Sequence, residues 1–361
     1  MAGYPDNQFF NYSKLFRFLN FHINNCGDPF QAKASYYRIN THKFEKEVID
    51  IFAQLFHAPK NNYWGYVTNG GTEGNLYGIY VARELHPEGV VIYSQDTHYS
   101  IAKICRLLRV PSLHIKSQPN GEIDYNALQD ALAHEKRPPI IVANIGTTMK
   151  GAVDEVLKIK EILADLKIQN YYIHCDAAFF GMILPFVHEM ESQLFDFRAG
   201  VDSIAVSGHK LIGTPMPCGV VLVKNSNAEK INSFIEYIGS SDKTITGSRN
   251  GLSPLILWYE LKSAKREKLT EIINICLKRA SYAIQKFNEK NIKAWRNKNS
   301  MIVLFTRPSD TIIRKWQLAV EGDLAHLITL PQVTHRVIDA IVNEVAHESK
   351  KPKAKRGRKS R

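Results

Sequence analysis

Two features of the sequence predict an α/β protein with a doubly wound, three-layer domain and a smaller α+β domain after it. Between residues 64 and 223, short apolar runs alternate with amphipathic helical patterns, as successive βαβ units do. Several runs are almost wholly apolar, which favours a parallel sheet covered by helices on both faces. Beyond about residue 225, long helical patterns precede a few short strands. The predicted divisions are an N-terminal segment (1–42), a large domain (43–238), a small domain (239–348) and a tail (349–361).

The spacing of apolar side chains predicts each element in turn. Phe44, Val48 and Phe52 recur at helical spacing, which indicates a helix over 43–58. Further helices are expected to end near Leu85 and to span 99–109, 125–135, 154–166, 226–238, 252–289, 309–320 and 334–347. Strands are expected at 64–68, 90–93, 113–115, 140–144, 171–175, 203–206, 220–223, 292–295, 301–306 and 325–330.

Most of the excess charge lies in the tail. The 361 residues carry a net charge of +12, and residues 350–361 (KKPKAKRGRKSR) hold eight basic residues and no acid, which leaves +4 for the rest. The body is therefore not a strongly basic nucleic-acid binder. The tail is expected to contact polyanions such as nucleic acid weakly and independently of catalysis, with nuclear targeting as an alternative role.

Several protein classes are excluded. No apolar run approaches the roughly 18–20 residues that cross a bilayer, and the N-terminus lacks the features of a secretory signal. The five cysteines are scattered and form no C-x-x-C pair, which argues against a disulfide framework or a zinc knuckle. We therefore expect a soluble, cytoplasmic protein with no structural metal.

A glycine-rich turn between a strand and a helix is the first chemical signal. Residues 68–75 read TNGGTEGN, where glycines let the backbone approach an anion at a helix N-terminus. The spacing is neither G-x-G-x-x-G nor a P-loop, so it favours a phosphate over a dinucleotide or ATP. A tight turn without a ligand is the alternative.

Three further signals also follow predicted strands. Asp176 ends a buried strand, where open α/β sheets bind ligands, although it could instead cap a helix. Lys210, in SGHK, could form a Schiff base with an aldehyde once its pKa is lowered, although a lone lysine is usually only solvated. His98, in DTHYS, could stack on a planar ring or transfer a proton, and its alternative is a core or capping histidine.

Taken in order, these signals match the needs of one cofactor. A phosphate site, a stacking imidazole, a carboxylate and a lysine, each at a strand's carboxyl end, are what pyridoxal 5′-phosphate (PLP) requires. The cofactor expected from the residues is therefore PLP.

Longer motifs resemble those of the PLP-dependent group II amino-acid decarboxylases over about residues 4–346. They are INNCGD (23–28), WGYVTNGGTEGN (64–75), DTHYSIAK (96–103), SQPNGEIDY (117–125), NIGTTMKGA (144–152), SGHKLIGTPMPCGV (207–220), DKTITGSRNG (242–251) and AWRNKNS (294–300). The resemblance implies PLP fold type I, the aspartate-aminotransferase architecture. It also implies a homodimer with active sites at the subunit interface.

The resemblance assigns roles by motif. Lys210 would hold the cofactor, His98 would stack on its ring, and Asp176 would pair with the ring nitrogen. Ala178 would lie against the other ring face, and Thr147 and Thr148 would line the cleft, with Thr148 assigned to the cofactor. The phosphate would be surrounded by Gly71, Thr72, Glu73, Ser207 and His209.

Other roles implied by the family concern the substrate and the partner subunit. Tyr237 and His98 are candidates for the acid that protonates the substrate Cα, and Ser300 is a candidate to face the substrate side chain. Segment 236–251 would reach the partner subunit, with Ser248 and Arg249 near its phosphate. The alternative is that this segment only caps the next helix.

Two branches of the family share features with this chain. AWRNKNS, SQPNGEIDY and DKTITGSRNG are more similar to the histidine-specific branch, whereas 24–30 and 314–326 are more similar to the serine-specific branch. We expect L-histidine to be converted to histamine and CO2, with L-serine to ethanolamine as the alternative. Rival classes are another fold type I activity, such as an aminotransferase or carbon–sulfur lyase, and a PLP-binding protein without turnover whose tail contacts nucleic acid.

Overall fold

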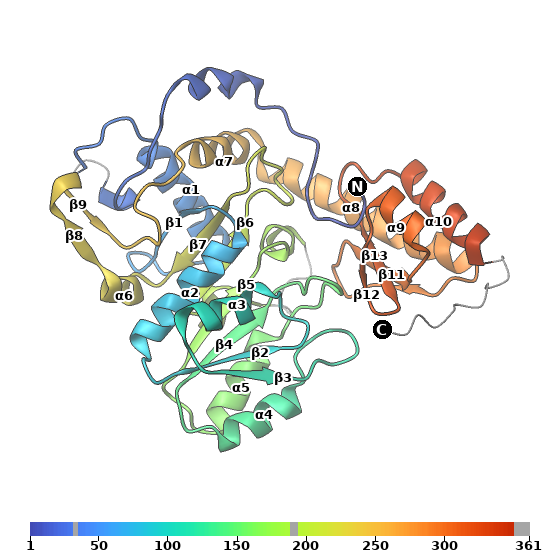
Figure 1. The fold of residues 1–361 in the computed structure, drawn as a ribbon, viewed down its shortest axis with the longest axis horizontal. Coiled ribbons are helices and arrows are strands. Elements are labelled where there is room, and N and C mark those ends of the chain that lie inside the picture. The colour runs from blue at the N-terminus through green and yellow to red at the C-terminus, as the bar shows by residue number, and fades with distance from the viewer. Residues whose placement is uncertain (32–34, 188–193, 350–361) are drawn as a thin grey trace, which may run out of the picture.

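The computed structural model describes residues 1–31, 35–187 and 194–349 (Figure 1). The basic stretch 350–361, and with it the predicted polyanion contact, lies outside the described residues. Within those ranges, no helix is both long and apolar enough to cross a membrane.

A seven-stranded sheet forms the centre of the larger unit, in the order β1-β7-β6-β5-β4-β2-β3. Its strands are β1 (Trp64–Thr68), β2 (Val90–Ser94), β3 (Ser112–Ile115), β4 (Pro139–Asn144), β5 (Tyr172–Asp176), β6 (Ser203–Ser207) and β7 (Gly219–Val223). Neighbouring strands from β3 to β6 pair in parallel, as predicted. β7 instead runs antiparallel to both β1 and β6, so the sheet is mixed.

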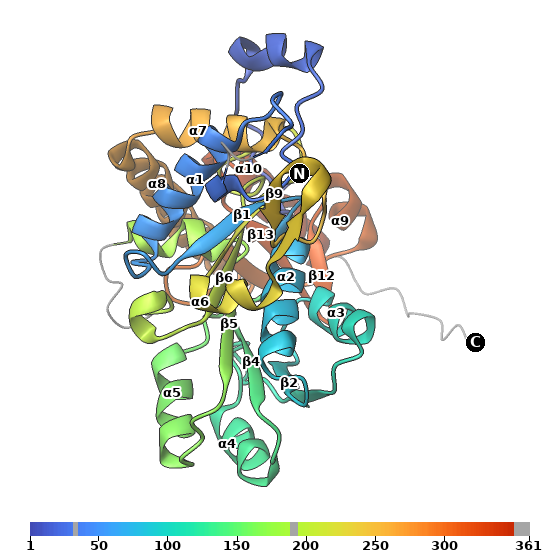
Figure 2. The same cartoon turned by 90° about the vertical axis from the view of Figure 1, so that its left-hand side faces the viewer.

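Helices cover both faces of this sheet, which confirms the predicted three layers (Figure 2). Along β4, Ile140 and Val142 belong to the apolar core shared with α2 and α3, whereas Ile141 and Ala143 belong to the opposite core. This alternation follows from the two-residue period of a strand. The helices are α1 (His42–Leu55), α2 (Gly71–Leu85), α3 (Ser100–Leu108), α4 (Tyr125–His134), α5 (Val156–Asp165) and α7 (Leu252–Ser263).

The smaller unit is an antiparallel sheet in the order β10-β11-β13-β12, packed against three helices. Its elements are α8 (Arg266–Glu289), β10 (Ala294–Trp295), β11 (Ile302–Thr306), α9 (Asp310–Trp316), β12 (Ala319–Glu321), β13 (Leu324–Ile328) and α10 (His335–Ser349). Helix α8 joins the two units: Ile273 and Cys276 lie in the core of the large unit, and Ala283 and Phe287 in that of the small one.

The region around residues 226–242 differs from the prediction. In place of one helix it holds α6 (Asn225–Ala228), two short 3-10 turns and the hairpin of β8 (Ser233–Ile235) and β9 (Ser240–Asp242). The predicted domain boundary between 238 and 239 falls inside this hairpin. Since α7 packs beside α1 on the large unit, we propose a boundary near residue 265 instead.

Two other predicted helices end early because of local backbone conformation. The helix expected over 252–289 is divided into α7 and α8 because Ala264, with ψ near 90°, leaves the helical region. The helix expected over 309–320 ends at Trp316, since Gln317 adopts a left-handed φ of 51°, and the chain then pairs with β13 as β12.

The N-terminal segment runs along both units (Figure 1). The Ala2 amide donates to the Trp316 carbonyl, and the Asn7 amide donates to the Lys210 carbonyl, both at 2.9 Å. Two short 3-10 helices follow, at Ser13–Asn20 and Pro29–Gln31, before α1. The first residues of the chain therefore lie between the small sheet and the carboxyl ends of the large one.

Candidate active site

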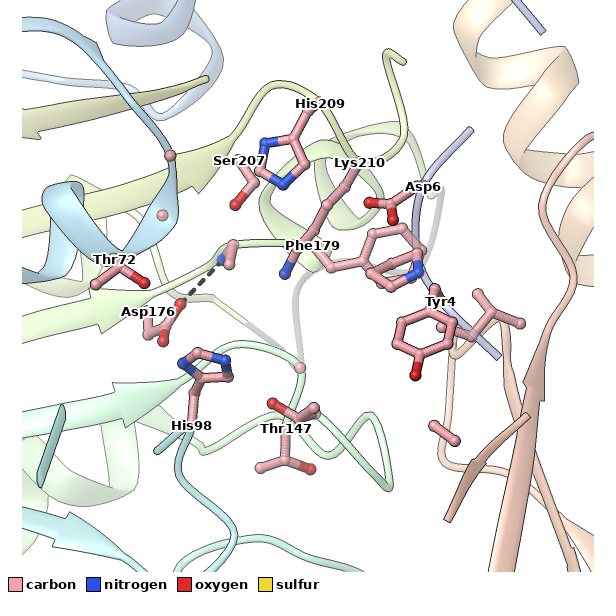
Figure 3. Close-up of a pocket in the computed structure, with 18 of the residues that line it drawn as sticks. Tyr4, Asp6, Thr72, His98, Thr147, Asp176, Phe179, Ser207, His209 and Lys210 are labelled. Atoms are coloured by element: carbon pink, nitrogen blue, oxygen red, sulfur yellow. Dashed lines mark hydrogen bonds between the residues drawn. The ribbon is translucent and has the colours of Figure 1, made fainter. Parts of the chain in front are cut away.

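A cavity of about 530 Å³ opens where the strands of the large sheet end (Figure 3). Asn144, Asp176 and Ser207, the last residues of β4, β5 and β6, all line it. This is the edge at which open α/β sheets bind ligands. Its size is within the range of small-molecule and cofactor sites.

The N-terminus of α2 forms one wall. Gly70 precedes the helix with a φ of 139°, and no side chain caps this end. A Cβ on Gly71 would lie 2.7 Å from Ser207 Oγ, so only glycine lets the helix end approach β6 this closely. Uncapped amides and the positive end of the helix dipole make this wall suited to a phosphate.

Lys210 lies on the turn after β6, and its side chain extends into the cavity (Figure 3). Burial lowers the pKa of the Lys210 ammonium, and the carboxylates of Asp176 and Asp6 act in the opposite direction. A lowered pKa leaves a larger fraction of the amine neutral, and the neutral amine is the form that attacks a carbonyl.

Asp176 is nearly buried and is held by two donors. Its Oδ2 accepts from Asn75 Nδ2 at 2.7 Å, and its Oδ1 accepts from the Ala178 amide at 3.2 Å. A buried carboxylate needs such donors to offset the loss of water. It can therefore present a fixed negative charge to a cationic ring nitrogen.

His98 is half-buried beside this carboxylate. Its Nδ1 accepts from the Ser100 amide at 3.3 Å and lies 2.8 Å from Ser100 Oγ, so in the neutral ring the proton is on Nε2. Burial lowers the pKa of His98, although Asp176 opposes this. The neutral ring is suited to stacking on a planar ligand and to donating from Nε2.

The structure brings most of the predicted residues to this one cavity. Besides Lys210, Asp176 and His98, the lining includes Gly71, Thr72, Thr147, Thr148, Ala178, Ser207 and His209. Thr147 is buried and its Oγ1 accepts from the Ala152 amide, whereas Thr148 is exposed at the rim. His209 is anchored through Nδ1, 2.9 Å from the Cys218 carbonyl oxygen.

Glu73 does not line the cavity, contrary to its predicted place around the phosphate. Its Oε2 accepts from both the backbone amide and the side-chain amide of Asn69, and its Oε1 accepts from the Tyr66 hydroxyl. The carboxylate thus stabilises the turn from behind. This placement also keeps its negative charge away from an anion.

Ser300 and Tyr237 are also absent from the lining. Ser300 is fully buried, and its hydroxyl accepts from the Ile302 amide at 3.0 Å, so Ile302 rather than Ser300 faces the cavity. Tyr237 is 84% exposed in the turn that joins β8 to β9. Arg249, predicted near the partner's phosphate, is buried in an ion pair with Glu45 of its own chain.

Several lining residues carried no recognisable signal in the sequence. Gly3, Tyr4, Pro5 and Asp6 close one side of the cavity, opposite the α2 wall in Figure 3. His326 connects this segment to the loop after β4: its Nε2 lies 3.0 Å from the Gly3 oxygen and its Nδ1 lies 2.8 Å from the Met149 oxygen. Asn75, which also lines the cavity, lies in the GTEGN motif on the first turns of α2.

The mixed α/β sheet and this cavity define a class of enzyme. A nucleophilic lysine, a buried carboxylate, an imidazole and an anion-binding helix end around one cavity are the elements of a fold type I PLP enzyme. Residues 38–305 match the model of the pyridoxal-dependent decarboxylase conserved domain, and the chain belongs to that family.

Relatives of known activity span nearly the whole chain. The histidine decarboxylase of Morganella morganii is 50% identical over 347 residues, covering 95% of this chain and 91% of its own. That of Pseudomonas entomophila is 49% identical over 350 residues, covering 96% and 86%. The solved structure of L-methionine decarboxylase from Streptomyces sp. 590 superposes with a TM-score of 0.88 at 28% identity, covering 96% and 91%. The chain is thus a PLP-dependent amino-acid decarboxylase of fold type I.

Proposed function

We propose that this protein decarboxylates L-histidine to histamine and CO2. The observation that carries the proposal is the near full-length identity of about one half to histidine decarboxylases of several bacteria. The geometry supports the reaction class, since Lys210, Asp176 and His98 lie around one cavity. In the described residues, no arginine lines this cavity to clamp the substrate carboxylate, which disfavours an aminotransferase.

The residues present fit PLP, which supplies an aldehyde for the substrate amine and a ring that accepts electrons as CO2 leaves. Lys210 would hold it covalently, and the uncapped amides at the start of α2, next to Ser207, would receive its phosphate. Asp176 would fix a proton on the ring nitrogen, and Ala178 and His98 would lie on the two ring faces. His209, Thr72 and Thr148 would complete the contacts.

The N-terminal segment is the proposed contact for the substrate side chain. Tyr4 and Asp6 line the cavity on the side of the small unit, and Asp6 is close enough to Lys210 to influence its pKa. A carboxylate and a phenol hydroxyl can both accept from an imidazole N–H. We therefore assign recognition of the imidazole ring to Tyr4 and Asp6 rather than to Ser300.

We further propose a homodimer in which an exposed apolar surface pairs with its copy. Two backbone hydrogen bonds tie parts of this surface together: the Tyr36 amide donates to the Ile238 carbonyl, and the Asn24 amide donates to the Ile39 carbonyl. Its exposed side chains are Phe9, Phe10, Phe16, Leu19, Phe21, Tyr36, Ile39, Phe234 and Tyr237. Exposed apolar patches of this kind mark association sites. Tyr237 would then act as the Cα acid of the partner's site, with His98 as its alternative.

Three other proposals concern the substrate, the location and the tail. Conversion of L-serine to ethanolamine would use the same cavity and the same residues. Cytoplasmic location is supported by the five cysteines, none of which forms a disulfide and four of which are buried.

Contact of the tail with nucleic acid would be independent of catalysis. It is tested by deleting residues 350–361, after which salt-sensitive retention on DNA should vanish while turnover is kept.

Amine formation by the PLP-loaded protein on a panel of L-amino acids, followed by mass spectrometry, tests the proposal. Histamine as the main product supports it, and ethanolamine as the main product replaces histidine by serine. Lys210→Ala should abolish the product while leaving the fold intact by circular dichroism. Turnover by that variant would contradict the role assigned to Lys210, and bound PLP without any amine product would contradict the activity.

A further inference from the structure

A chain of hydrogen bonds runs from β6 through β5 and α2 to Asp176. Ser203 Oγ lies 2.7 Å from His174 Nδ1, and His174 Nε2 lies 3.0 Å from Asn75 Oδ1. Asn75 Nδ2 then donates to Asp176 Oδ2 at 2.7 Å. Ser203 and His174 are fully buried and Asn75 is 2% exposed, so water does not compete for these bonds.

The Asp176 carboxylate, at the end of this series of hydrogen bonds, fixes the donor and the acceptor of each one. An ionised carboxylate can only accept, so Asn75 must turn its NH2 toward Asp176 and its oxygen toward His174. His174 Nε2 must therefore carry a proton, and in the neutral ring Nδ1 then accepts from the Ser203 hydroxyl. Burial lowers the pKa of His174 to about 4, which keeps the ring neutral. All three donors thus point toward the carboxylate.

The positions of β5 and α2 make this series of hydrogen bonds possible. His174 and Asp176 lie two residues apart on β5 and so face the same side, toward α2. On α2, a Cβ at Gly74 would lie 2.9 Å from the Ala205 Cβ, and one at Gly78 would lie 2.3 Å from His174 Nδ1. Glycine at both positions brings the helix close enough for Asn75 to reach between the two β5 side chains.

We propose that Asn75 and His174 are positioning residues that orient the Asp176 carboxylate and stabilise its negative charge, with Ser203 fixing the His174 tautomer. The proposal deepens the proposed function, because the charge on Asp176 matters for catalysis only when it faces the PLP ring nitrogen. Removing one of these donors makes the ionised carboxylate less stable, so a proton at the ring nitrogen is drawn toward the Asp176 oxygen.

The test uses PLP labelled with ¹⁵N in the ring and bound to the full-length protein. In the parent protein the ¹⁵N shift should report a protonated ring nitrogen. Asn75→Leu and His174→Phe should move it toward the neutral value and lower kcat roughly tenfold, as expected for one lost bond to a charged group. His174→Gln keeps an N–H toward Asn75 and should retain most of the parent shift. Thr329→Val, which removes an equally buried hydroxyl in the small unit, is the matched control and should leave the shift unchanged.

A second readout needs no cofactor. In apo protein labelled with ¹⁵N-histidine, His174 should show the Nε2–H tautomer, and Ser203→Ala should weaken that preference. An Nδ1–H tautomer would overturn the direction of the chain, and an unchanged ring shift in folded, PLP-loaded Asn75→Leu and His174→Phe would overturn the proposal. Failure of the parent protein to bind PLP would instead contradict the proposed function.

Discussion

Gly78 of α2 and His174 of β5 leave no room between them for one more carbon atom. A Cβ on residue 78 would lie 2.3 Å from Nδ1 of the His174 ring and 2.5 Å from its Cε1. The ring cannot easily move aside, because both of its nitrogens lie within hydrogen-bond distance of partners, Ser203 and Asn75. The absence of a side chain at residue 78 therefore sets the distance between α2 and the sheet, and with it the position of Asn75 against Asp176.

Two opposing effects decide the outcome of Gly78→Ala. Alanine in a helix is favoured over glycine by roughly 0.5–1 kcal/mol. Overpacking a buried site costs about 1–3 kcal/mol, and here the contact is with a hydrogen-bonded ring. We expect the cost to prevail, with a net loss of about 1–2 kcal/mol in the free energy of unfolding of the apo protein, measured in urea, and a fall in kcat.

The matched control is Gly247→Ala, because a Cβ there would meet no atom within 4 Å. This variant should change the free energy of unfolding by less than about 0.5 kcal/mol. If Gly78→Ala were as stable as the parent protein, α2 would be able to move away from the sheet at a lower energetic cost than its contacts indicate.

Stability should depend on pH through His174. Because burial lowers the pKa of this histidine from 6.5 to about 4, the unfolded chain binds more protons than the folded one between these values. Stability from this group is therefore complete above pH 6.5 and is lost as the pH falls, by about 2 kcal/mol at pH 5. Burial raises the pKa of Asp154 to about 6, which acts in the opposite direction, so the measurement must be differential.

The comparison is between the parent protein and His174→Gln, each unfolded in urea at pH 7 and pH 5. Glutamine keeps the donor toward Asn75 but does not titrate. The parent should lose about 2 kcal/mol more than the variant over this interval. Equal losses in the two proteins would show that His174 is not held neutral in the fold.

The sequence predicts best what depends on neighbouring residues. Strand ends and helix starts follow from local periodicity, so Asp176, Lys210 and His98 could be assigned to one edge of the sheet. The Asn75 contact could have been found from GTEGNLYG, where glycines at 71, 74 and 78 share one face of α2. That face predicts a close approach to the sheet and hence a buried partner for Asn75.

Other features depend on contacts that no local pattern contains. His326 meets Gly3 across 323 residues of sequence, so the N-terminal wall of the cavity has no signature in either segment. The motif predicts Glu73 at the phosphate, but a side chain on the first turn of a helix can also reach back to the preceding turn, as its bonds to Asn69 show. The motif likewise predicts Ser300 beside the substrate, whereas its hydroxyl accepts from the Ile302 backbone amide.

The N-terminal wall should control substrate binding. A Cβ on Gly3 would lie 2.2 Å from the Ala319 backbone nitrogen, so Gly3→Ala must push the segment away from the small sheet. Tyr4 and Asp6 would shift with it. We expect KM for L-histidine to rise about tenfold in steady-state assays, as for the loss of one good polar contact. Ser13→Ala, an exposed change later in the same segment, should leave KM unchanged, and an unaltered KM in Gly3→Ala would exclude the segment from substrate recognition.

Mixing two inactive variants would decide whether Tyr237 acts in the partner's site. Tyr237 is 84% exposed and lies outside the cavity of its own chain, so it can contribute only if a second subunit brings it there. Tyr237→Phe and Lys210→Ala should each be inactive or nearly so. In a heterodimer of the two, one site receives an intact Lys210 and an intact Tyr237. Random exchange of subunits should thus restore about a quarter of the parental activity.

The control is a second mixture, made from the single variants Lys210→Ala and Asp176→Ala. Both residues belong to the cavity of a single chain, so the exchange creates no intact site and activity should stay absent. If the Tyr237→Phe and Lys210→Ala mixture also stays inactive although exchange is demonstrated by mass, Tyr237 does not act as the acid in the partner's site. In that case His98, whose Nε2–H is inside the cavity, becomes the acid that returns a proton to Cα.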